Sequence, residues 1–420
     1  MKLGVIADDY TGATDAASFI VKNGLSTVQF NGVPEGDMSS HLKSTEAIVI
    51  GQKTRALPPE SAVIASLNAL EWLKKQGCEH IFFKYCSTFD STEQGNIGPV
   101  TDALLDALNS DFTVVCPALP VNGRTVYQGY LFVHDVLLNE SGMRNHPLTP
   151  MRDASLLRLM DSQSAGRSTL LPFGIVEQGH MACVEESLKA RSGGGRYLVC
   201  DALNEMHLDT LGAAFCNLPL ATGGSGLAGA IAKALSVSSE LPFEVAAFTP
   251  YKPDFGLVVS GSCSEMTNQQ VEAYQSIAPS FKVDVEKCLN ENRYFMEVAE
   301  WVLENKNQRV FPMVYATVPP GELAEIQKKH GNKASSAIEQ MFHLLISHLK
   351  LMGLGAVVSA GGETSGTVTQ AFDLDGVRIG REIAPGVPWV QSFDGTVSLA
   401  LKSGNFGDRD FFITAQESME

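Results

Sequence analysis

The chain has 420 residues, 44% of them hydrophobic and 19% charged, an ordinary balance for a globular protein, and this length favours two domains over one. Its net charge of −16 and pI near 5.0 argue against a general affinity for nucleic acid or anionic membranes, so basic groups that bind anionic substrates must be gathered locally. No apolar run approaches the roughly 18 residues that a membrane span requires.

Short apolar runs alternate with helical patterns along the whole chain. In the first half the predicted strands and helices are, in order, Leu3–Ala7, Thr11–Lys22, Ala47–Gly51, Glu60–Lys75, His80–Lys84, Pro99–Leu108, Phe112–Cys116 and Tyr197–Cys200. In the second half they are Gly256–Ser260, Met266–Ser276, Tyr294–Glu304, Pro312–Thr317, Ser335–Met352, Gly355–Ala360 and Ser398–Lys402. This alternation of strand and helix predicts an α/β fold in which each domain is a largely parallel sheet flanked by helices.

One stretch interrupts this alternation. Residues Ser236–Pro253 contain Pro242, Pro250 and Pro253 and have the composition of a linker. We therefore predict a domain boundary near residue 248, with one domain at 1–247 and a second at 248–420, both of ordinary domain size.

Cysteine and histidine usage indicates the compartment. The eight cysteines are scattered without a CxxC pair, and several lie in apolar stretches, where they resemble small core residues. This usage fits a reducing cytosol, and Asp8 and Asp9 interrupt the apolar stretch that a signal peptide would need, so we expect a cytoplasmic protein. The nine histidines show no HExxH and no metal-ligand spacing, so no transition-metal site is predicted.

Two adjacent carboxylates follow the first predicted strand. Asp8 and Asp9 stand where Leu3–Ala7 ends and the helix at Thr11 begins. Successive side chains alternate sides, so one of the two is expected to face a site and the other to cap the helix, which is the ordinary role of an aspartate there. An acidic pair at a strand end has few packing reasons, which makes at least one of them a candidate for catalysis or substrate contact.

Basic groups follow two further strands. Arg55 comes shortly after Ala47–Gly51, and Lys84 ends His80–Lys84, just before a segment that contains Ser87 and Asp90. Arg55 and Lys84 are candidates for binding a carboxylate, with arginine favoured for a two-pronged contact. The alternative for both is ordinary surface charge. Arg124, in a loop after a later strand, either assists in binding or shapes a turn.

Three strands of the second half end in loops rich in glycine and hydroxyl groups. These loops begin at Gly261, Gly361 and Ser403. Ligands of open α/β sheets bind beyond the carboxyl ends of strands, and backbone N–H groups at a helix start favour a phosphate, so these loops together predict a polyphosphate site. No Walker A sequence occurs, so a P-loop fold is not predicted.

Two charged residues of these loops have open alternatives. Glu363 either holds Mg²⁺, directly or through water, or stabilises the N-terminus of the following helix. Lys402 either pairs with a phosphate or flanks a strand end. A third motif, Gly224–Gly229, matches GxGxxG, but the expected strand ending in an acidic residue does not follow, and we interpret it as a loop facing the interdomain cleft, near the phosphates.

Five ordered motifs give the chain a family resemblance that spans essentially its whole length. It resembles the four-carbon acid sugar kinase family through Ile6–Ala13, Lys84–Thr92, Ala360–Gly366, Ala384–Trp389 and Leu401–Gly407. The one departure is Tyr10, where many relatives carry Leu or Phe. The resemblance implies an ATP-dependent kinase with an acid-sugar-binding domain at 1–247, a nucleotide-binding domain at 248–420 and an active site in the interdomain cleft.

The resemblance also assigns expected roles to single residues. It implies ATP contacts at Ser262, Gly361, Gly362, Glu363, Thr364, Gly404 and Gly407. We expect Mg·ATP to phosphorylate the terminal hydroxyl of a 3-oxo-tetronate, and this reaction depends on positioning and charge neutralisation. Substrate binding is then expected from Arg55, Lys84 and Ser87, with Asp8 or Asp9 as the catalytic base and Asp90 in reserve.

Three alternatives remain at this point. The first is a kinase for threonate or erythronate, which differs only in how one carbonyl or hydroxyl is recognised. The second is an NAD-dependent sugar-acid oxidoreductase that uses the GxGxxG loop. The third is a non-catalytic sugar-acid binding protein, a class that is usually exported. A homodimer is expected from the prevalence of homo-oligomers among soluble enzymes.

Overall fold

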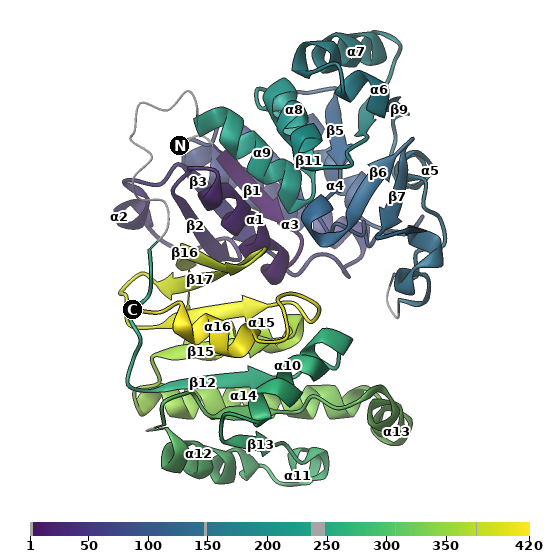
Figure 1. Cartoon of the computed structure of the whole chain (residues 1–420). Coiled ribbons are helices and arrows are strands. Elements are labelled where there is room, and N and C mark those ends of the chain that lie inside the picture. The colour runs from purple at the N-terminus through teal and green to yellow at the C-terminus, as the bar shows by residue number, and fades with distance from the viewer. Residues whose placement is uncertain (1–2, 147–148, 237–247, 307, 375) are drawn as a thin grey trace. The chain divides into compact units, whose positions relative to one another are not determined.

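The computed structural model describes residues 3–146, 149–236, 248–306, 308–374 and 376–420 (Figure 1). The chain divides into two compact units, Met1–Ala247 and Phe248–Glu420. Most of the stretch interpreted as a linker, residues 237–247, lies outside the described residues.

The N-terminal unit is built on a parallel sheet. In spatial order its strands are β2 (Thr27–Asn31), β3 (Ala47–Gly51), β1 (Leu3–Ala7), β4 (His80–Lys84), β11 (Leu220–Gly223), β5 (Thr113–Cys116), β10 (Tyr197–Cys200) and β9 (Ser168–Leu171). Residues of β1 and β4 are buried on both faces, as in a sheet covered by helices on each side.

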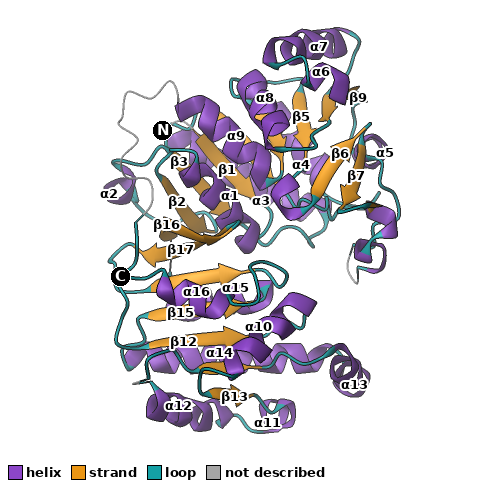
Figure 2. Ribbon diagram, in the orientation of Figure 1, coloured by secondary structure: helices purple, strands orange, loops and turns teal. Residues whose placement is uncertain are grey.

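Helices cover both faces of this sheet. On one face lie α1 (Tyr10–Lys22), α7 (His180–Ser192), α8 (Glu205–Phe215) and α9 (Ser225–Ser236), and on the other α3 (Pro59–Lys75), α4 (Ile97–Ala107) and α5 (Leu156–Gln163) (Figures 1 and 2). The short helices α2 (Ser39–Leu42) and α6 (Phe173–Val176) lie in connections. A separate antiparallel sheet contains β6 (Arg124–Tyr127), β7 (Tyr130–Val133) and β8 (Val136–Leu137).

The C-terminal unit carries a mixed sheet. Its order is β13 (Ser280–Lys282), β14 (Met313–Tyr315), β12 (Gly256–Ser260), β15 (Ala356–Ala360), β18 (Ser398–Lys402), β17 (Val387–Ser392) and β16 (Gly376–Ala384). The first five are parallel, and β16 and β17 join as an antiparallel hairpin. The helices are α10 (Glu265–Gln275), α11 (Val285–Asn290), α12 (Tyr294–Asn305), α13 (Pro320–His330), α14 (Asn332–Leu351), α15 (Gly362–Phe372) and α16 (Phe411–Glu417).

The α/β architecture agrees with the prediction from the sequence, and every strand predicted there is present within a few residues of its bounds. The sequence analysis did not predict several other strands, among them β2, β9, β11 and β13, nor the β16–β17 hairpin. The helix that follows β15, α15, begins at Gly362, inside the glycine-rich loop that the sequence analysis placed after this strand. Gly361 has φ of +119°, a conformation open to glycine, so the strand turns directly into the helix.

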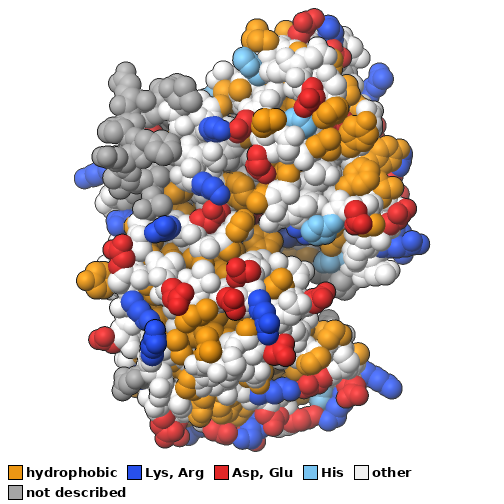
Figure 3. Space-filling model, viewed as in Figure 1, with side chains coloured by type: hydrophobic (Ala, Val, Ile, Leu, Met, Phe, Trp, Pro, Cys, Tyr) orange, Lys and Arg blue, Asp and Glu red, His pale blue; other side chains and the backbone are white. Residues whose placement is uncertain are grey.

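The surface shows no single-sign field in the view of Figure 3, where acidic and basic side chains are interspersed. Hydrophobic side chains gather over β6 and β7 in that view, where Tyr127 and Tyr130 are 43% and 38% exposed. Within the described ranges, no helix combines the length and apolar character needed to cross a membrane.

Candidate active site

The acidic and basic residues predicted in the N-terminal unit meet at the carboxyl ends of β1, β3 and β4. Ala7 on β1 lies opposite Gly51 on β3 and Lys84 on β4, so the residues that follow these strands emerge side by side. The backbone N–H of Asp8 donates to the carbonyl of Lys84 at 3.1 Å, and the N–H of Arg55 donates to the carbonyl of Asp8 at 3.1 Å. The sheet register therefore brings distant sequence motifs together.

Arg55 connects the two aspartates. Its Nε and Nη2 donate to both carboxylate oxygens of Asp8 at 2.9 and 2.7 Å, a two-pronged contact, and Nη2 also donates to Asp9 Oδ1 at 2.8 Å. Nη1 lies 3.8 Å from Asp90 Oδ2. Arg55 was predicted to bind a substrate carboxylate, but here its guanidinium is largely engaged by carboxylates of the protein.

Asp9 has the capping role that the sequence assigned to one of the pair. It is the N-cap of α1: Oδ1 accepts from the Gly12 N–H at 2.9 Å, and Oδ2 accepts from the Thr11 hydroxyl at 2.7 Å. Its side chain is nevertheless 27% exposed, whereas that of Asp8 is 4% exposed. Asp9 is therefore the carboxylate of the pair that solvent or a ligand can reach.

Gly12 leaves room for two charged groups. A Cβ atom at this position would lie 2.2 Å from Asp9 Oδ1 and 2.9 Å from Lys84 Nζ. Lys84 is thus held beside the first turn of α1 and next to Asp9, with only 2% of its surface exposed. The ordinary surface-charge alternative for Lys84 is excluded by this burial.

Asp90 lies on a strained turn. Phe89 and Asp90 have φ of +65° and +34°, and such left-handed residues persist only where surrounding structure holds them. Phe89 is fully buried against Tyr85, with ring centroids 5.5 Å apart, and Asp90 Oδ1 accepts from the Thr88 hydroxyl at 2.7 Å. Ser87 is half-buried on the same loop. Strain of this kind is typical of functional loops.

Electrostatics separate the two aspartates. Burial raises the pKa of Asp8 above its ordinary value, although the charge and hydrogen bonds of Arg55 oppose this rise. Burial also acts on Asp9, but Arg55, Lys84 and the bonds from Thr11 and Gly12 together lower its pKa. Asp9 is consequently ionised near neutral pH and can accept a hydrogen bond.

The three predicted loops of the C-terminal unit converge at a switch point of its sheet. The connection after β12 leads through α10 to β13 on one side, and the connection after β15 leads through α15 to β16 on the other. Ligands of open α/β sheets bind in the crevice outside the carboxyl ends of such strands. Both α10, capped by Ser264, and α15, which starts after Gly361, direct their N-termini to this edge.

The loops touch one another. A Cβ on Gly361 would lie 3.2 Å from Ser262 Cβ, and one on Gly404 would lie 2.6 Å from Ser262 Oγ. The same loops and one face of α14 line a pocket of about 230 Å³. Its lining includes Ser262, Gly361, Gly362, Glu363, Thr364, Gly404 and the α14 residues Ser335, Ile338, Glu339 and Phe342. This pocket unites all but one of the predicted ATP-binding residues.

Gly407 is the exception. Its φ is +74°, and a Cβ there would lie 2.6 Å from the ring of Phe411. Glycine is needed at this position to close the turn before α16. Glu363 is exposed in the first turn of α15, a position at which a negative charge interacts favourably with the helix dipole.

Lys402 is the last residue of β18, in agreement with the strand-end position that the sequence left open as one alternative. Its side chain is completely buried and is not part of the lining of the pocket. Its Nζ donates inward to Thr267 Oγ1 at 3.1 Å and to the carbonyls of Ser403 and Gly404 at 3.0 and 2.8 Å. Burial lowers the pKa of Lys402 to about 7. Thr267 was not predicted as a site residue, because the sequence showed it only as a residue in the first turn of the predicted helix Met266–Ser276.

The interpretation of Gly224–Gly229 as a loop is wrong. Ser225 begins α9, and the hydroxyl of Ser225 donates to Asp15 Oδ2 at 2.6 Å in the buried interior. Cβ atoms on Gly224 and Gly226 would lie 2.7 Å from the carbonyl oxygen of Pro117 and 2.9 Å from that of Ala118. Close packing of strand, loop and helix therefore requires glycine at both positions.

Comparison with known proteins finds two family matches along this chain. Residues 3–231 match the family described as sugar-binding N-terminal domain, and residues 257–412 match the nucleotide-binding C-terminal domain. Curated relatives named 3-oxo-tetronate kinase include one from Brucella melitensis, 52% identical over 99% of this chain and 95% of its own. Another, from Haemophilus influenzae, is 52% identical over 99% of each chain.

Solved structures of relatives have the same fold. A Haemophilus influenzae protein aligns with a TM-score of 0.83 at 51% identity, covering 99% of both chains. A Salmonella typhimurium protein aligns with a TM-score of 0.92 at 50% identity, covering both chains completely. The latter is described as a tRNA synthase, whereas a curated Salmonella typhimurium relative, also 50% identical, is named 3-oxo-tetronate kinase.

Proposed function

This chain belongs to the four-carbon acid sugar kinase family, and we propose that it transfers the γ-phosphoryl group of ATP to the terminal hydroxyl of 3-oxo-tetronate. The observation that carries the proposal is the likeness, at 52% identity over 99% of the chain, to proteins named 3-oxo-tetronate kinase. The acidic composition, with a net charge of −16, supports a small substrate over a nucleic acid. The location of the active site in the interdomain cleft stays a prediction.

The C-terminal unit, Phe248–Glu420, is the proposed nucleotide-binding domain. Phosphate oxygens would accept from backbone N–H groups at the starts of α10 and α15, where the helix dipoles also favour negative charge. Ser262, Thr364 and the glycines at 361, 362 and 404 line the pocket that supports this assignment. Gly407 would act through the shape of the loop.

Magnesium is the proposed metal cofactor. Mg²⁺ in kinases is commonly bound by substrate phosphates, waters and one or two carboxylates. Glu363 fits that requirement, because it is an exposed carboxylate at the same pocket as the phosphate-binding loops. Bound Mg²⁺ would neutralise charge on the phosphates, while Glu363 would hold the ion directly or through water.

The N-terminal unit, Met1–Ala247, is the proposed acid-sugar domain, with Asp9 as the group that orients the attacking hydroxyl. Asp9 is the more exposed of the two aspartates, and its lowered pKa keeps it available as an acceptor. In the transfer, the hydroxyl oxygen bonds to the γ-phosphorus, the bond from the γ-phosphorus to the bridging oxygen breaks, and the hydroxyl proton passes to Asp9. ADP leaves with the bridging oxygen.

Neighbouring charges complete the proposed acceptor site. Asp8 would position Arg55, which in turn holds Asp9 at 2.8 Å. Lys84, buried beside Asp9, would supply the positive charge that attracts the carboxylate of the acid sugar. Asp90, on its strained turn, and Ser87 would bind hydroxyl groups of the same substrate.

A coupled assay of ADP release with a panel of four-carbon acids tests this proposal. We expect ATP-dependent turnover with a 3-oxo-tetronate and a much smaller kcat/KM with threonate and erythronate. Turnover with threonate and none with the 3-oxo acid would assign the chain to the alternative substrate. No turnover with any acid of the panel would refute the kinase proposal.

The cellular setting is also proposed. Use of ATP and the presence of all eight cysteines as free thiols support a cytoplasmic location. Assembly as a homodimer stays a prediction.

A further inference from the structure

The segment Ser403–Asp408, here called the third loop, has its carbonyl groups bound by buried side chains. Lys402 Nζ donates hydrogen bonds to the carbonyls of Ser403 and Gly404, at 3.0 and 2.8 Å. The hydroxyl of Thr267 also donates to the carbonyl of Gly404, at 2.7 Å. The side-chain amide of Gln270 donates to the carbonyls of Phe406 and Asp408, at 3.1 and 2.7 Å.

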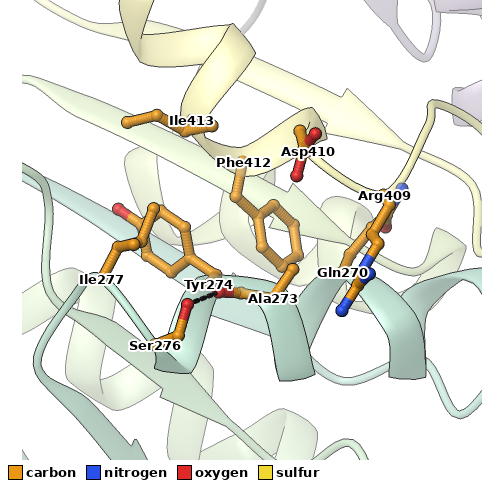
Figure 4. Close-up of a pocket in the computed structure, with 9 residues that line it drawn as sticks. All are labelled: Gln270, Ala273, Tyr274, Ser276, Ile277, Arg409, Asp410, Phe412 and Ile413. Atoms are coloured by element: carbon orange, nitrogen blue, oxygen red, sulfur yellow. Dashed lines mark hydrogen bonds between the residues drawn. The ribbon is translucent and has the colours of Figure 1, made fainter.

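These three side chains form one buried group, here called the clamp. Lys402, Thr267 and Gln270 are each 0% exposed, and the first two are joined by the 3.1 Å bond from Nζ to Oγ1. In its protonated form Lys402 has three N–H donors, and its three contacts use all of them. Figure 4 shows Gln270 extending from α10 towards the segment that carries Arg409 and Asp410.

The clamp is also connected to the loop that follows β12. Ser264 donates through its hydroxyl to Thr267 Oγ1 at 3.0 Å, and the N–H of Ser264 donates to Ser262 Oγ at 3.2 Å. The hydrogen bonds therefore run from Ser262 through Ser264 and Thr267 to Gly404. A change at Thr267 should disturb both loops at once.

Because the clamp holds the carbonyl groups of the third loop by hydrogen bonds, it also fixes the direction of the N–H groups in the same peptide units. In a trans peptide the C=O of one residue and the N–H of the next point in opposite directions. The carbonyls of Ser403, Gly404 and Phe406 point to the clamp, so the N–H groups of Gly404, Asn405 and Gly407 point away from it. Successive N–H groups on one side of a loop make an anion-binding concavity.

We propose that Lys402, Thr267 and Gln270 are positioning residues that hold the third loop with its N–H groups directed at a phosphate of the bound nucleotide. This inference rests on the proposed function for the nature of the anion. The clamp acts through the backbone and does not itself touch the nucleotide. It explains why a lysine beside a glycine-rich loop is buried and turned inward.

The test compares Thr267→Val, which removes the hydroxyl at nearly constant shape, with Thr267→Ser, which retains it. Lys402→Met removes the ammonium. Ser276→Ala is the matched control, because Ser276 is the exposed C-cap residue of α10 and its hydroxyl donates, among the described residues, only to the carbonyl of Ala273, at 2.6 Å. Binding of ADP and of a non-hydrolysable ATP analogue is measured by calorimetry, and KM is measured for ATP and for the acid sugar.

We expect Thr267→Val and Lys402→Met to weaken nucleotide binding by at least about tenfold, the usual effect of an unpartnered buried polar group. KM for the acid sugar should stay within about twofold, and Thr267→Ser should restore most of the nucleotide affinity. Hydrogen exchange at residues 403–408 should rise in the two weakened variants and remain unchanged in Ser276→Ala.

Two outcomes would refute the proposed role of the clamp. One is unchanged nucleotide affinity in a folded Thr267→Val variant, and the other is an equal loss of affinity for the nucleotide and for the acid sugar. If Thr267→Val does not fold, Thr267→Ser and Lys402→Met decide the matter by the same comparison. Nucleotide binding without turnover on any acid would refute the proposed reaction and leave the clamp standing. Direct calorimetry therefore separates the two failures.

Discussion

The tightest packing at the acidic cluster is at Gly12, and its replacement by alanine separates stability from catalysis. Alanine in a helix gains up to about 1 kcal/mol over glycine. Against this, the new Cβ would lie 2.2 Å from Asp9 Oδ1, where real Cβ contacts below 3.0 Å essentially never occur. The carboxylate must retreat, which weakens a capping bond of about 1 kcal/mol. The two effects on stability nearly cancel.

Their effects on the reaction do not cancel. Moving Asp9 Oδ1 from 2.2 Å to at least 3.0 Å from the new atom is a shift of roughly 1 Å, and misplacement of that size lowers turnover by about 10²-fold. We therefore expect Gly12→Ala to reduce kcat about 100-fold while the midpoint of thermal unfolding moves by only a few degrees. The measurements are the coupled ADP-release assay and thermal denaturation.

Gly321 provides the matched control. It lies in the first turn of α13, and a Cβ there would have no heavy atom of the described residues within 4 Å. Gly321→Ala should stabilise the protein by up to about 1 kcal/mol and leave kcat unchanged. A folded Gly12→Ala variant with normal turnover would refute the argument that Asp9 must stay where the structure has it.

Three further predictions follow from the same geometry. Asp9→Asn should lower kcat by about 10²–10⁴-fold. Asp8→Asn should mainly lower the unfolding free energy, by a few kcal/mol, because it removes the negative charge and one of the two acceptor oxygens that Arg55 contacts. Equal losses of kcat and equal stability in the two variants would contradict this expectation. Burial lowers the pKa of Lys402 from 10.5 to about 7, so between pH 7 and pH 10.5 the unfolded chain binds a proton that the folded chain has lost. The unfolding free energy should therefore rise with pH across that range by up to about 5 kcal/mol (3.5 units at about 1.4 kcal/mol each). Denaturant titrations at several pH values should show this rise for the wild type and not for Lys402→Met. Gly361→Ala places a Cβ at φ +119° and 3.2 Å from Ser262, and it should raise KM for ATP at least about tenfold. Gly353→Ala, with φ +89° and no described heavy atom within 4 Å of its Cβ, should cost about 1–3 kcal/mol of stability through backbone strain, as Gly361→Ala also should, but should leave that KM unchanged. A raised KM in both variants would assign the effect to strain alone.

Local sequence determined much of this protein because its signals are short-range. Alternating apolar and helical patterns identify the strands that carry the site, and the dipeptide Asp8–Asp9 before a helix predicts the cap that Asp9 makes. The glycine and hydroxyl pattern after β12 and β15 likewise predicts loops at strand ends. In these cases the interactions that determine the local structure involve residues only a few positions apart in the chain.

Tertiary structure decided the chemistry of individual charges, because burial and pairing depend on residues far apart in the chain. Arg55 is separated from Asp9 by 46 positions, and only the β1–β3 register places its guanidinium against both aspartates. The sequence left Lys402 either as a phosphate partner or at a strand end, and only the fold shows that its ammonium donates inward to Thr267 on α10, 135 positions away. The GxGxxG pattern was misinterpreted for the same reason. Glycine is required there because the backbone of residues 117–118 packs against it, and this contact cannot be recognised from a local pattern.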